Sequence, residues 1–303
     1  MRDRRLRAHR FPRKLINSYK LSSANCGMQE FPVVAVVRGE RGHEPVFKAF
    51  DLIDYKRALA GYDKVLIKVN FITTKTWDTG ATTDPIVVEA IIKKLADLPV
   101  KAYVVESDAT ITNADEAFEV TGMKDMCRQN GIEWINLRHI KDKVKLEVPD
   151  GEVLKTITVP RLVTESAIIS AAKLKTHLNT TVTLGMKNMF GLLPDKLKGK
   201  YHLKGISKVI VDINTVLRPT ISIIDGFVGM EGKGPIDGTP IQMDLIIAGT
   251  DPVATDATAS RIMGFNPYEI KHIRKAFEKG LGKSEAQIVG EKLETVLRQF
   301  KQE

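Results

Sequence analysis

Six short apolar runs, rich in β-branched residues and separated by stretches with helical signals, constrain the fold of this chain more than any other feature. The runs are PVVAVV (32–37), KVLIKVN (64–70), VKAYVVES (100–107), SAIISAA (166–172), TISIID (220–225) and MDLIIAG (243–249). Nearly continuous apolar runs of this length are typical of strands buried on both faces, as in a parallel sheet between layers of helices. We therefore predict an α/β fold with mainly parallel sheets covered by helices.

Helix-capping signals occur in the stretches between these runs. Three pairs place a capping side chain directly before a proline at the first helical position: Asp84-Pro85, Asp251-Pro252 and Asn266-Pro267. Glu269 stands three residues after Asn266, as in a capping box. Strands that alternate with helices begun in this way favour the same α/β fold.

One stretch in the middle of the chain has a different pattern. Residues 143–160, KVKLEVPDGEVLKTITVP, alternate between polar and apolar side chains around a Pro-Asp-Gly turn. This alternation predicts a β-hairpin inserted into the α/β fold. We expect residues 28–303 to form a single domain, and a division into two interlocked subdomains near residue 160 is the alternative.

The positive charge of the chain is concentrated in its first residues. Residues 1–27 contain eight Lys or Arg and one Asp, so they carry +7 of the net charge of +9 and leave +2 for residues 28–303. A nucleic-acid-binding domain carries a basic face on its folded part, so we expect nucleic-acid binding only through residues 1–27. This segment is either a flexible basic arm or lies upstream of a true translation start at Met28.

Other function classes are excluded by motifs that the sequence lacks. No apolar run reaches the about 18 residues of a membrane span, so we expect no membrane partner. Cys26 and Cys127 form no C-x-x-C pair, so we expect no intrinsic iron–sulfur cluster and a reducing, cytoplasmic setting. The chain also lacks the glycine-rich loops of classical NTPases and dinucleotide enzymes and the G-x-S-x-G elbow of hydrolases. Acid–base chemistry on an anion, or binding alone, remains.

Residues 173–204 combine positive charge with an apolar turn. They hold seven Lys and two His against one acidic residue, Asp195. Lys173, Lys175 and His177 alternate, as on one side of an extended segment, so these three groups can converge. Such a convergence would form one wall of an anion-binding site.

Lys187 and Asn188 follow a glycine in the same segment, where the chain can turn back toward the strand. We predict that His177 and Lys187 act as a catalytic acid–base pair, because a histidine titrates near neutral pH and a lysine crowded by cations loses its proton readily. The remaining lysines of the loop are interpreted as solvated: Lys196, Lys198 and Lys200.

A further group of donors stands at the end of the run VLIKVN. Lys68 and Asn70 lie at the carboxyl end of this predicted strand, and the helix start at Asp84 behind them adds free backbone N–H groups. We predict that Lys68, Asn70, Lys175 and Asn188 bind the anion. The alternative is that Lys68 points out of an edge strand and that Asn70 caps a turn.

Acidic residues also follow several predicted strands. The candidate site residues among them are Asp225, Glu231, Asp251 and Asp256, with Glu106 and Asp108 in a similar position. Carboxylates at strand ends could bind a divalent metal or pair with the lysines. For Asp251 and Asp256 the alternative is structural, because an Asp before Pro caps a helix and an acidic residue in the first turn favours the helix dipole.

Three separated motifs resemble the DUF362 family of bacterial and archaeal proteins. They are VLIKVN with GATTDP and VVEAII, LKTHLNTTVTLGMKNMFGLLP, and IIDGFVGMEGKGP followed by AGTDPVATDATASRIMGF, which together cover most of residues 64–267. The family is named for its unknown function, and some relatives carry a ferredoxin-like cluster domain whose Cys-rich motifs this chain lacks. The resemblance implies a shared site formed by the following residues: Lys68, Asn70, Lys175, His177, Lys187, Asn188, Asp225, Glu231, Asp251 and Asp256.

The spacing of His177 and Lys187, followed by an apolar run to Pro194, is also similar to a segment of lactate racemase-like proteins. Those enzymes use a His, a Gly-Gly-x-Lys and a Pro-Gly around a nickel-bearing pyridinium cofactor. The Gly pair and the Pro-Gly are absent here, so the cofactor is not carried across. The similarity implies that His177 and Lys187 face one small organic acid.

These observations support one leading hypothesis and two alternatives. The first is a protein that binds a small carboxylate or phosphate metabolite and performs acid–base chemistry on it. The second is a non-catalytic accessory or redox-partner protein that docks through its basic loop on an iron–sulfur or cofactor-assembly enzyme. The third is nucleic-acid binding through residues 1–27.

Overall fold

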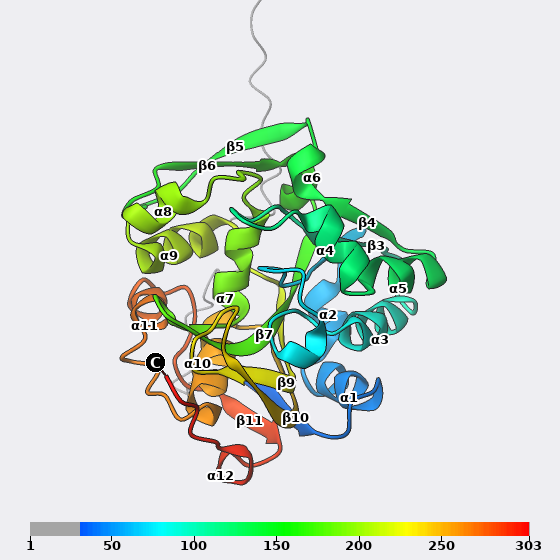
Figure 1. The fold of residues 1–303 in the computed structure, drawn as a ribbon, viewed down its shortest axis with the longest axis vertical. Coiled ribbons are helices and arrows are strands. Elements are labelled where there is room, and N and C mark those ends of the chain that lie inside the picture. Colours follow the sequence, from blue (N-terminus) through cyan, green and yellow to red (C-terminus); the bar gives the residue numbers. More distant parts are fainter. Residues whose placement is uncertain (1–30, 303) are drawn as a thin grey trace, which may run out of the picture. The chain divides into compact units, whose positions relative to one another are not determined.

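A nine-stranded mixed sheet forms the centre of the computed structural model, which describes residues 31–302 (Figure 1). The strand order is β11-β1-β10-β9-β7-β2-β3-β4, and β8 pairs with β7 off this path. The strands of this sheet are β1 (Val33–Arg38), β2 (Lys64–Lys68), β3 (Lys101–Glu106), β4 (Glu133–Asn136), β7 (Ala167–His177), β8 (Thr181–Thr183), β9 (Ile221–Glu231), β10 (Thr239–Gly249) and β11 (Gln287–Gly290).

Most neighbouring strands in the sheet are parallel. β9, β7, β2, β3 and β4 run in the same direction, and β1 is parallel to β11. β10 is antiparallel to both of its neighbours, β1 and β9. The short connection at 232–238 joins β9 and β10 as a hairpin, since a parallel pair would need a long crossover. The predicted α/β fold with a mainly parallel sheet is confirmed.

Helices lie on both faces of this sheet (Figure 1). The α-helices are α1 (Glu44–Leu52), α2 (Tyr55–Leu59), α3 (Pro85–Leu95), α4 (Ala114–Val120), α5 (Met123–Gln129), α6 (Arg161–Thr164), α7 (Gly185–Asn188), α8 (Gly199–Leu203), α9 (Ile206–Val216), α10 (Pro252–Ile262), α11 (Lys271–Glu278) and α12 (Leu293–Val296). The short 3₁₀ helices are η2 (Trp77–Thr79), η3 (Leu137–His139) and η4 (Met189–Leu192). No helix within residues 31–302 is long and apolar enough to cross a membrane.

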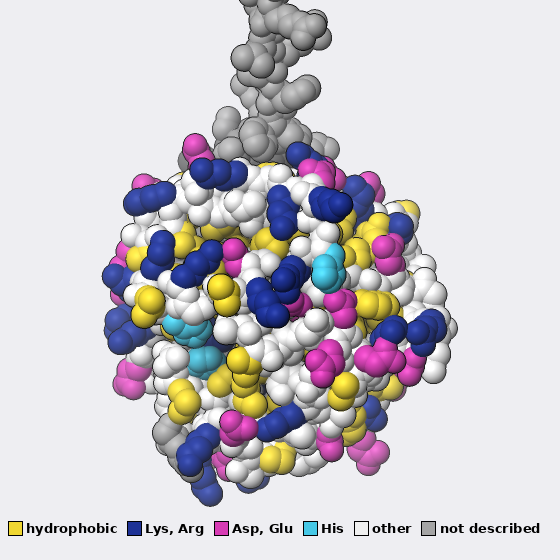
Figure 2. All heavy atoms as spheres, turned by 45° about the horizontal axis from the view of Figure 1, so that its top comes forward, with side chains coloured by type: hydrophobic (Ala, Val, Ile, Leu, Met, Phe, Trp, Pro, Cys, Tyr) yellow, Lys and Arg dark blue, Asp and Glu magenta, His cyan; other side chains and the backbone are white. Residues whose placement is uncertain are grey.

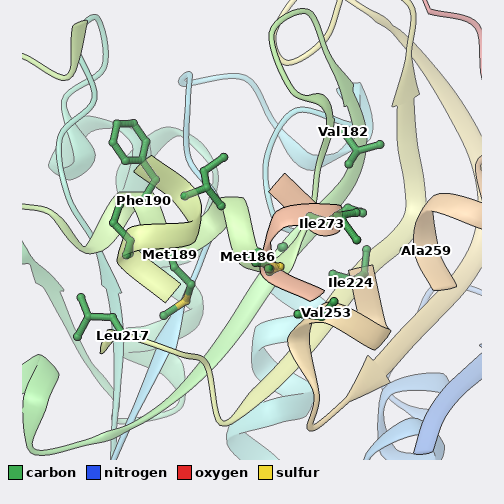
Figure 3. Packing of buried hydrophobic residues seen from close by; sticks show 14 of the residues in the cluster. Val182, Met186, Met189, Phe190, Leu217, Ile224, Val253, Ala259 and Ile273 are labelled. Atoms are coloured by element: carbon green, nitrogen blue, oxygen red, sulfur yellow. The ribbon is translucent and has the colours of Figure 1, made fainter. Parts of the chain in front are cut away.

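Two hydrophobic cores lie on opposite faces of the sheet. Alternate residues of β2 divide between them, with Leu66 in the core under α9 and α10 and with Val65 and Ile67 in the core under α1 and α3. This division is why the strand sequences are almost continuously apolar. Figure 3 shows Met186 of α7 beside Ile273 of α11, within the first of these cores.

Two of the three predicted helix starts are confirmed and one is wrong. Asp84 and Asp251 cap α3 and α10, and each side chain accepts hydrogen bonds from the first turn. Asn266 instead closes a turn, because its Oδ1 accepts from Tyr268 N and its Nδ2 donates to Glu269 Oε1. The backbone of Ile270 is extended, so the turn does not continue into a helix, and α11 begins at the next residue.

The predicted hairpin is confirmed as a separate two-stranded sheet. β5 (Lys143–Glu147) and β6 (Thr156–Pro160) pair in antiparallel register. The carboxylate of Asp212 on α9 accepts three backbone N–H bonds from residues 152–154, each at 2.8 Å, and fixes the hairpin loop on the helix. Residues 31–302 form one compact unit, in which residue 160 is the last of β6. The predictions for residues 1–27 and for Met28 concern a segment outside the described residues.

Candidate functional site

The carboxyl ends of β2, β3 and β7 bring most of the predicted site residues together. β7 and β9 extend beyond the predicted runs to 11 residues each, and the added half of β7 carries Lys173, Lys175 and His177, all of them buried. Lys68 ends β2, which lies inside the sheet between β7 and β3, so the edge-strand alternative for this residue is wrong. We call Lys68, Lys175, Lys187 and Lys198 the lysine cluster.

Lys68 is neutralised by a buried carboxylate. Its Nζ lies 2.7 Å from Glu106 Oε1 and donates to the carbonyl of Val69 at 2.6 Å. Burial lowers the pKa of Lys68, and the charge of Glu106 opposes this shift. Gly191 packs against the pair so closely that a Cβ there would lie 2.5 Å from Lys68 Nζ and 2.6 Å from Glu106 Oε1. Only a glycine lets the chain after α7 close over this ion pair.

Both the nitrogen and the oxygen of the Asn188 side-chain amide make hydrogen bonds that hold α7 against the sheet. Its Nδ2 donates to Lys68 O at 2.9 Å and to Ser170 Oγ at 3.1 Å. Its Oδ1 accepts from Lys68 Nζ at 3.2 Å and from Asn70 Nδ2 at 3.1 Å. By contrast, Asn70 Oδ1 is buried and accepts no hydrogen bond from any residue between 31 and 302. Asn70 therefore offers an unused acceptor beside the cluster.

Lys173 and Lys175 have different partners although they are two residues apart on β7. Lys173 Nζ lies 2.9 Å from Asp225 Oδ2, and both side chains are completely buried. Asp225 also accepts the backbone N–H of Asp84 at 2.8 Å. Lys175 Nζ donates to the carbonyls of Ala81 and Pro235 and has no carboxylate within 4.0 Å in the described part of the chain. Burial, then the charges of Lys187 and Lys173, hold the pKa of Lys175 well below its usual value.

Lys187 is the accessible member of the lysine cluster. Its side chain is half-buried on α7, and within residues 31–302 its ammonium group makes neither a hydrogen bond nor an ion pair. Burial, followed by the charges of Lys198 and Lys68, lowers the pKa of Lys187 to about 8. At neutral pH this group is therefore mostly charged, with a substantial neutral fraction.

Lys198 is buried, so its interpretation as a solvated loop residue is wrong. Its Nζ donates to Ser107 Oγ at 2.8 Å and lies 5.5 Å from the centre of the Phe190 ring. Burial lowers the pKa of Lys198 to about 8, with Glu106 opposing and Lys68 adding to the shift. Lys196 and Lys200 are exposed, as predicted.

Histidines surround Lys187, and their rings are neutral. His177 Nδ1 accepts the backbone N–H of Asn179 at 3.0 Å, so the ring proton must be on Nε2. Burial, then the charges of Lys187 and Lys175, lower the pKa of His177 to about 2. His272 of α11 is fully buried with neither nitrogen hydrogen-bonded within residues 31–302, and burial with Lys187 lowers its pKa to about 3. Lys187 also adds to burial in lowering the pKa of His202.

The acidic candidates serve mainly to hold elements in place. Asp251 Oδ1 caps α10, and its Oδ2 accepts the backbone N–H of Lys283 at 3.1 Å. Glu231 accepts the backbone N–H of Lys301 at 3.0 Å. Among residues 31–302, no group of three or more His, Cys, Asp or Glu side chains is placed to hold a metal ion. Of the four candidates, only Asp225 contacts a lysine of β7.

Asp256 supports the helix that carries Lys187. Its two carboxylate oxygens accept the backbone N–H groups of Gly185 and Met186, each at 2.9 Å, at the start of α7. The carboxylate is fully buried, and burial raises its pKa to about 7. Asp256 thus acts on the site through the position of α7.

We expect Asp256→Ala to destabilise the protein by about 1–3 kcal/mol for each of the two buried N–H groups that lose their acceptor. The measurement is urea unfolding. Asn113→Ala is the matched control, because Asn113 also accepts two N–H groups at a helix start, but near the surface. The control should cost about 0.5–2 kcal/mol. Equal losses in the two variants would contradict a special role for Asp256.

The excess positive charge of the cluster is an interior feature. On the face shown in Figure 2, Lys and Arg side chains are interspersed with acidic ones, although several basic residues gather near its middle. A surface hollow of about 400 Å³ lies elsewhere, between β1 and α1, and both acidic and basic residues line it, among them Glu40, Glu44 and Lys48. The hollow therefore offers no comparable preference for anions.

Comparisons with known proteins agree with the motifs in the sequence. The chain is 25% identical over 233 residues to the thylakoid-associated protein sll1697 of Synechocystis sp., which covers 75% of this chain and 71% of that protein. No solved structure shows a significant match. Residues 65–261, which include the whole lysine cluster and His177, match the family described as domain of unknown function (DUF362). Because this match spans more than half of its length, the chain belongs to the DUF362 family.

Proposed function

We propose that this protein binds a small anionic metabolite, a carboxylate or a phosphate, at the lysine cluster and performs acid–base chemistry on it. One observation carries the proposal: Lys175, Lys187 and Lys198 are buried or half-buried with no carboxylate within 4.0 Å among the described residues, and Lys187 is near enough to the other two for their charges to interact. Burying like charges without partners is costly. A bound anion would supply the missing negative charge.

In this proposal the ammonium groups of Lys187 and Lys198 hold the anion. Lys68 and Asn188, which the sequence assigns to binding, already make hydrogen bonds within the protein, so they position the cluster. Lys175 links two loops, because its ammonium group donates to the carbonyls of Ala81 and Pro235. Asn70 Oδ1 accepts a hydrogen bond from a donor group of the ligand, because the protein leaves this atom without one.

The acid–base role falls mainly to Lys187. Its pKa of about 8 allows it to release and regain a proton near neutral pH. His177, with a pKa of about 2, stays neutral, and its Nε2–H donates a hydrogen bond to the ligand. Lys187 would then exchange the proton while His177 orients the reacting group.

Ligand-induced melting shifts test this proposal. We expect at least one of lactate, pyruvate, citrate or inorganic phosphate to raise the melting temperature of the full chain, with or without Mg²⁺. A ligand at 100 times its Kd stabilises by about 2.7 kcal/mol. The shift should disappear in Lys187→Met and persist in the control Lys200→Met, because Lys200 is exposed and paired with Asp195. No shift with any probe, or an equal shift in Lys187→Met, would overturn the proposal.

We also propose that the protein works in the cytoplasm. Cys127 is a buried free thiol whose pKa burial raises to about 12, which makes it inert rather than redox-active. The name of the Synechocystis relative assigns a thylakoid association to that protein.

A second candidate function is the non-catalytic accessory role. Leu197 and Leu203 are 73% and 91% exposed and stand among exposed lysines in the loop after Pro194, which suits docking on another protein. A photo-crosslinking residue at position 203 should then capture one defined protein in cells, and capture of many abundant proteins would exclude this role. Nucleic-acid binding through residues 1–27 stays a prediction, since that segment lies outside the described residues.

A further inference from the structure

We propose that the ε-amino group of Lys187 is a nucleophile that forms a Schiff base with a small oxo acid, whose carboxylate is held by Lys198. This inference rests on the proposed function, because the same cluster binds the anion. It adds a carbonyl group to the ligand and a covalent step to the chemistry.

Among the four members of the lysine cluster, Lys187 has the free amino group. Lys68 is tied to Glu106, Lys175 to two backbone carbonyls and Lys198 to Ser107. Lys187 has no such contact within residues 31–302, and it is half-buried whereas the other three members are buried. A ligand entering the cluster therefore meets this amine first.

The backbone segment that carries this amine is firmly held. Met186, the residue before Lys187, packs in the core beside Ile273, as Figure 3 shows. Asn188, the residue after it, bonds to β2 and β7, and Asp256 holds the first turn of α7. Because these contacts fix the backbone of Lys187, its amine can meet a bound carbonyl group in one reproducible geometry.

The electrostatic environment of the amine favours its neutral form. A lysine desolvated beside other cations is the usual form of an amine nucleophile, because the neutral form attacks. Lys198 and Lys68 place positive charge next to Lys187 and support its pKa of about 8. An ordinary surface lysine, with a pKa near 10.4, has roughly two orders of magnitude less neutral amine at neutral pH.

The reaction needs no group that the cluster lacks. The lone pair of Lys187 Nζ attacks the carbonyl carbon, a C–N bond forms and the carbonyl π electrons move to oxygen. The ammonium group of Lys198 donates a proton to that oxygen, and a second proton from solvent converts it to water as the leaving group. The nitrogen then gives one of its two protons back to Lys198, which frees its lone pair. This lone pair forms the C=N bond, water departs, and the nitrogen remains as a protonated imine. The sum is amine, carbonyl and one proton giving iminium and water.

The iminium makes the carbon next to it reactive. It draws electrons from bonds at the neighbouring carbon, so an acid or a base nearby can exchange a proton there. Neutral His177 and His272, whose charges are suppressed by burial, add no further positive charge that would oppose iminium formation. An anionic phosphate without a carbonyl group would instead bind by charge alone, which the following experiment separates.

Hydride trapping tests the inference. Full-length protein is incubated with pyruvate, and separately with acetoacetate, in the presence of cyanoborohydride, which reduces an imine to a stable secondary amine. Peptide mass spectrometry then locates the product. We expect adduct at Lys187 in about tenfold or greater excess over Lys200, given the difference in neutral amine between them. Lys187→Arg, which keeps the charge but cannot form an imine, should lose the adduct, and Lys200→Arg should keep it.

Melting shifts measured in parallel, without reductant, distinguish the possible failures. An oxo acid that raises the melting temperature but leaves no adduct at Lys187 overturns the Schiff-base inference and leaves the proposed function standing. Adducts spread over exposed lysines in proportion to their exposure also overturn it. If neither the oxo acids nor phosphate raise the melting temperature and no adduct forms, both the inference and the proposed function fail. The unliganded melting temperature of Lys187→Arg, expected within a few degrees of the parent, shows that it is folded.

Discussion

Asp225→Ala should destabilise the protein by about 3–5 kcal/mol, because it leaves the completely buried ammonium of Lys173 without its partner. The change also removes the acceptor of the backbone N–H of Asp84, which starts α3. For a domain of this size, each kcal/mol lowers the melting temperature by about 2–4 °C. We therefore expect a fall of about 6–20 °C in a thermal melt followed by circular dichroism.

Two control variants sharpen this expectation. Asp237→Ala removes an exposed partner of Lys75, and it should change stability by less than about 0.5 kcal/mol. The double change Lys173→Met with Asp225→Ala should be less destabilising than Asp225→Ala alone, because no buried charge is then left unpaired. A double variant as unstable as the sum of its two single variants would show that the ion pair is not the cause.

The six apolar runs were enough to predict the sheet, because each of them became one strand of it. Three strands were not predicted: β4, β8 and β11 have only three or four residues each, and runs of this length carry little periodicity. The direction of β10 could not be predicted from the sequence either. It depends on how the short glycine-containing loop after β9 turns back, and the apolar pattern is the same for either direction.

Part of the candidate site followed from alternation along one strand. Lys173, Lys175 and His177 occupy one strand as their spacing predicted, and each of them is buried. The division of labour between them could not be predicted, since it depends on partners far away in the sequence. Lys173 has Asp225 as its partner, whereas Lys175 has only backbone carbonyls.

Two residues near the site, Lys198 and His272, were not predicted, because no local sequence pattern marks them. Lys198 stands in a run of alternating lysines that is typical of a solvated loop. It is nevertheless buried, and its ammonium group donates to Ser107, the residue after β3. His272 belongs to a helix nearly one hundred residues away from His177 and reaches the surroundings of Lys187 through the packing of α11 on α9. Tertiary contacts of this kind are set by packing and are invisible to patterns along the chain.

The affinity for a carboxylate probe should fall steeply above pH 8. Lys187 and Lys198 both have a pKa of about 8, so both are mostly protonated below that pH and the affinity is nearly constant there. Above it, the affinity should fall up to tenfold per pH unit for each lysine that must carry its proton. A bound anion stabilises the protonated lysines, so the pKa values of the complex lie above those of the free protein.

Isothermal titration between pH 6 and 10 measures this profile with lactate, whose carboxyl group does not titrate in this range and which has no keto group to react with Lys187. Lys187→Arg should remove one of the two steps, because a guanidinium stays charged throughout. Titrations above pH 8 in buffers of different ionisation enthalpy should also show proton uptake on binding. A flat profile to pH 10, or proton release, would mean that the anion is held by groups other than the amines of the cluster.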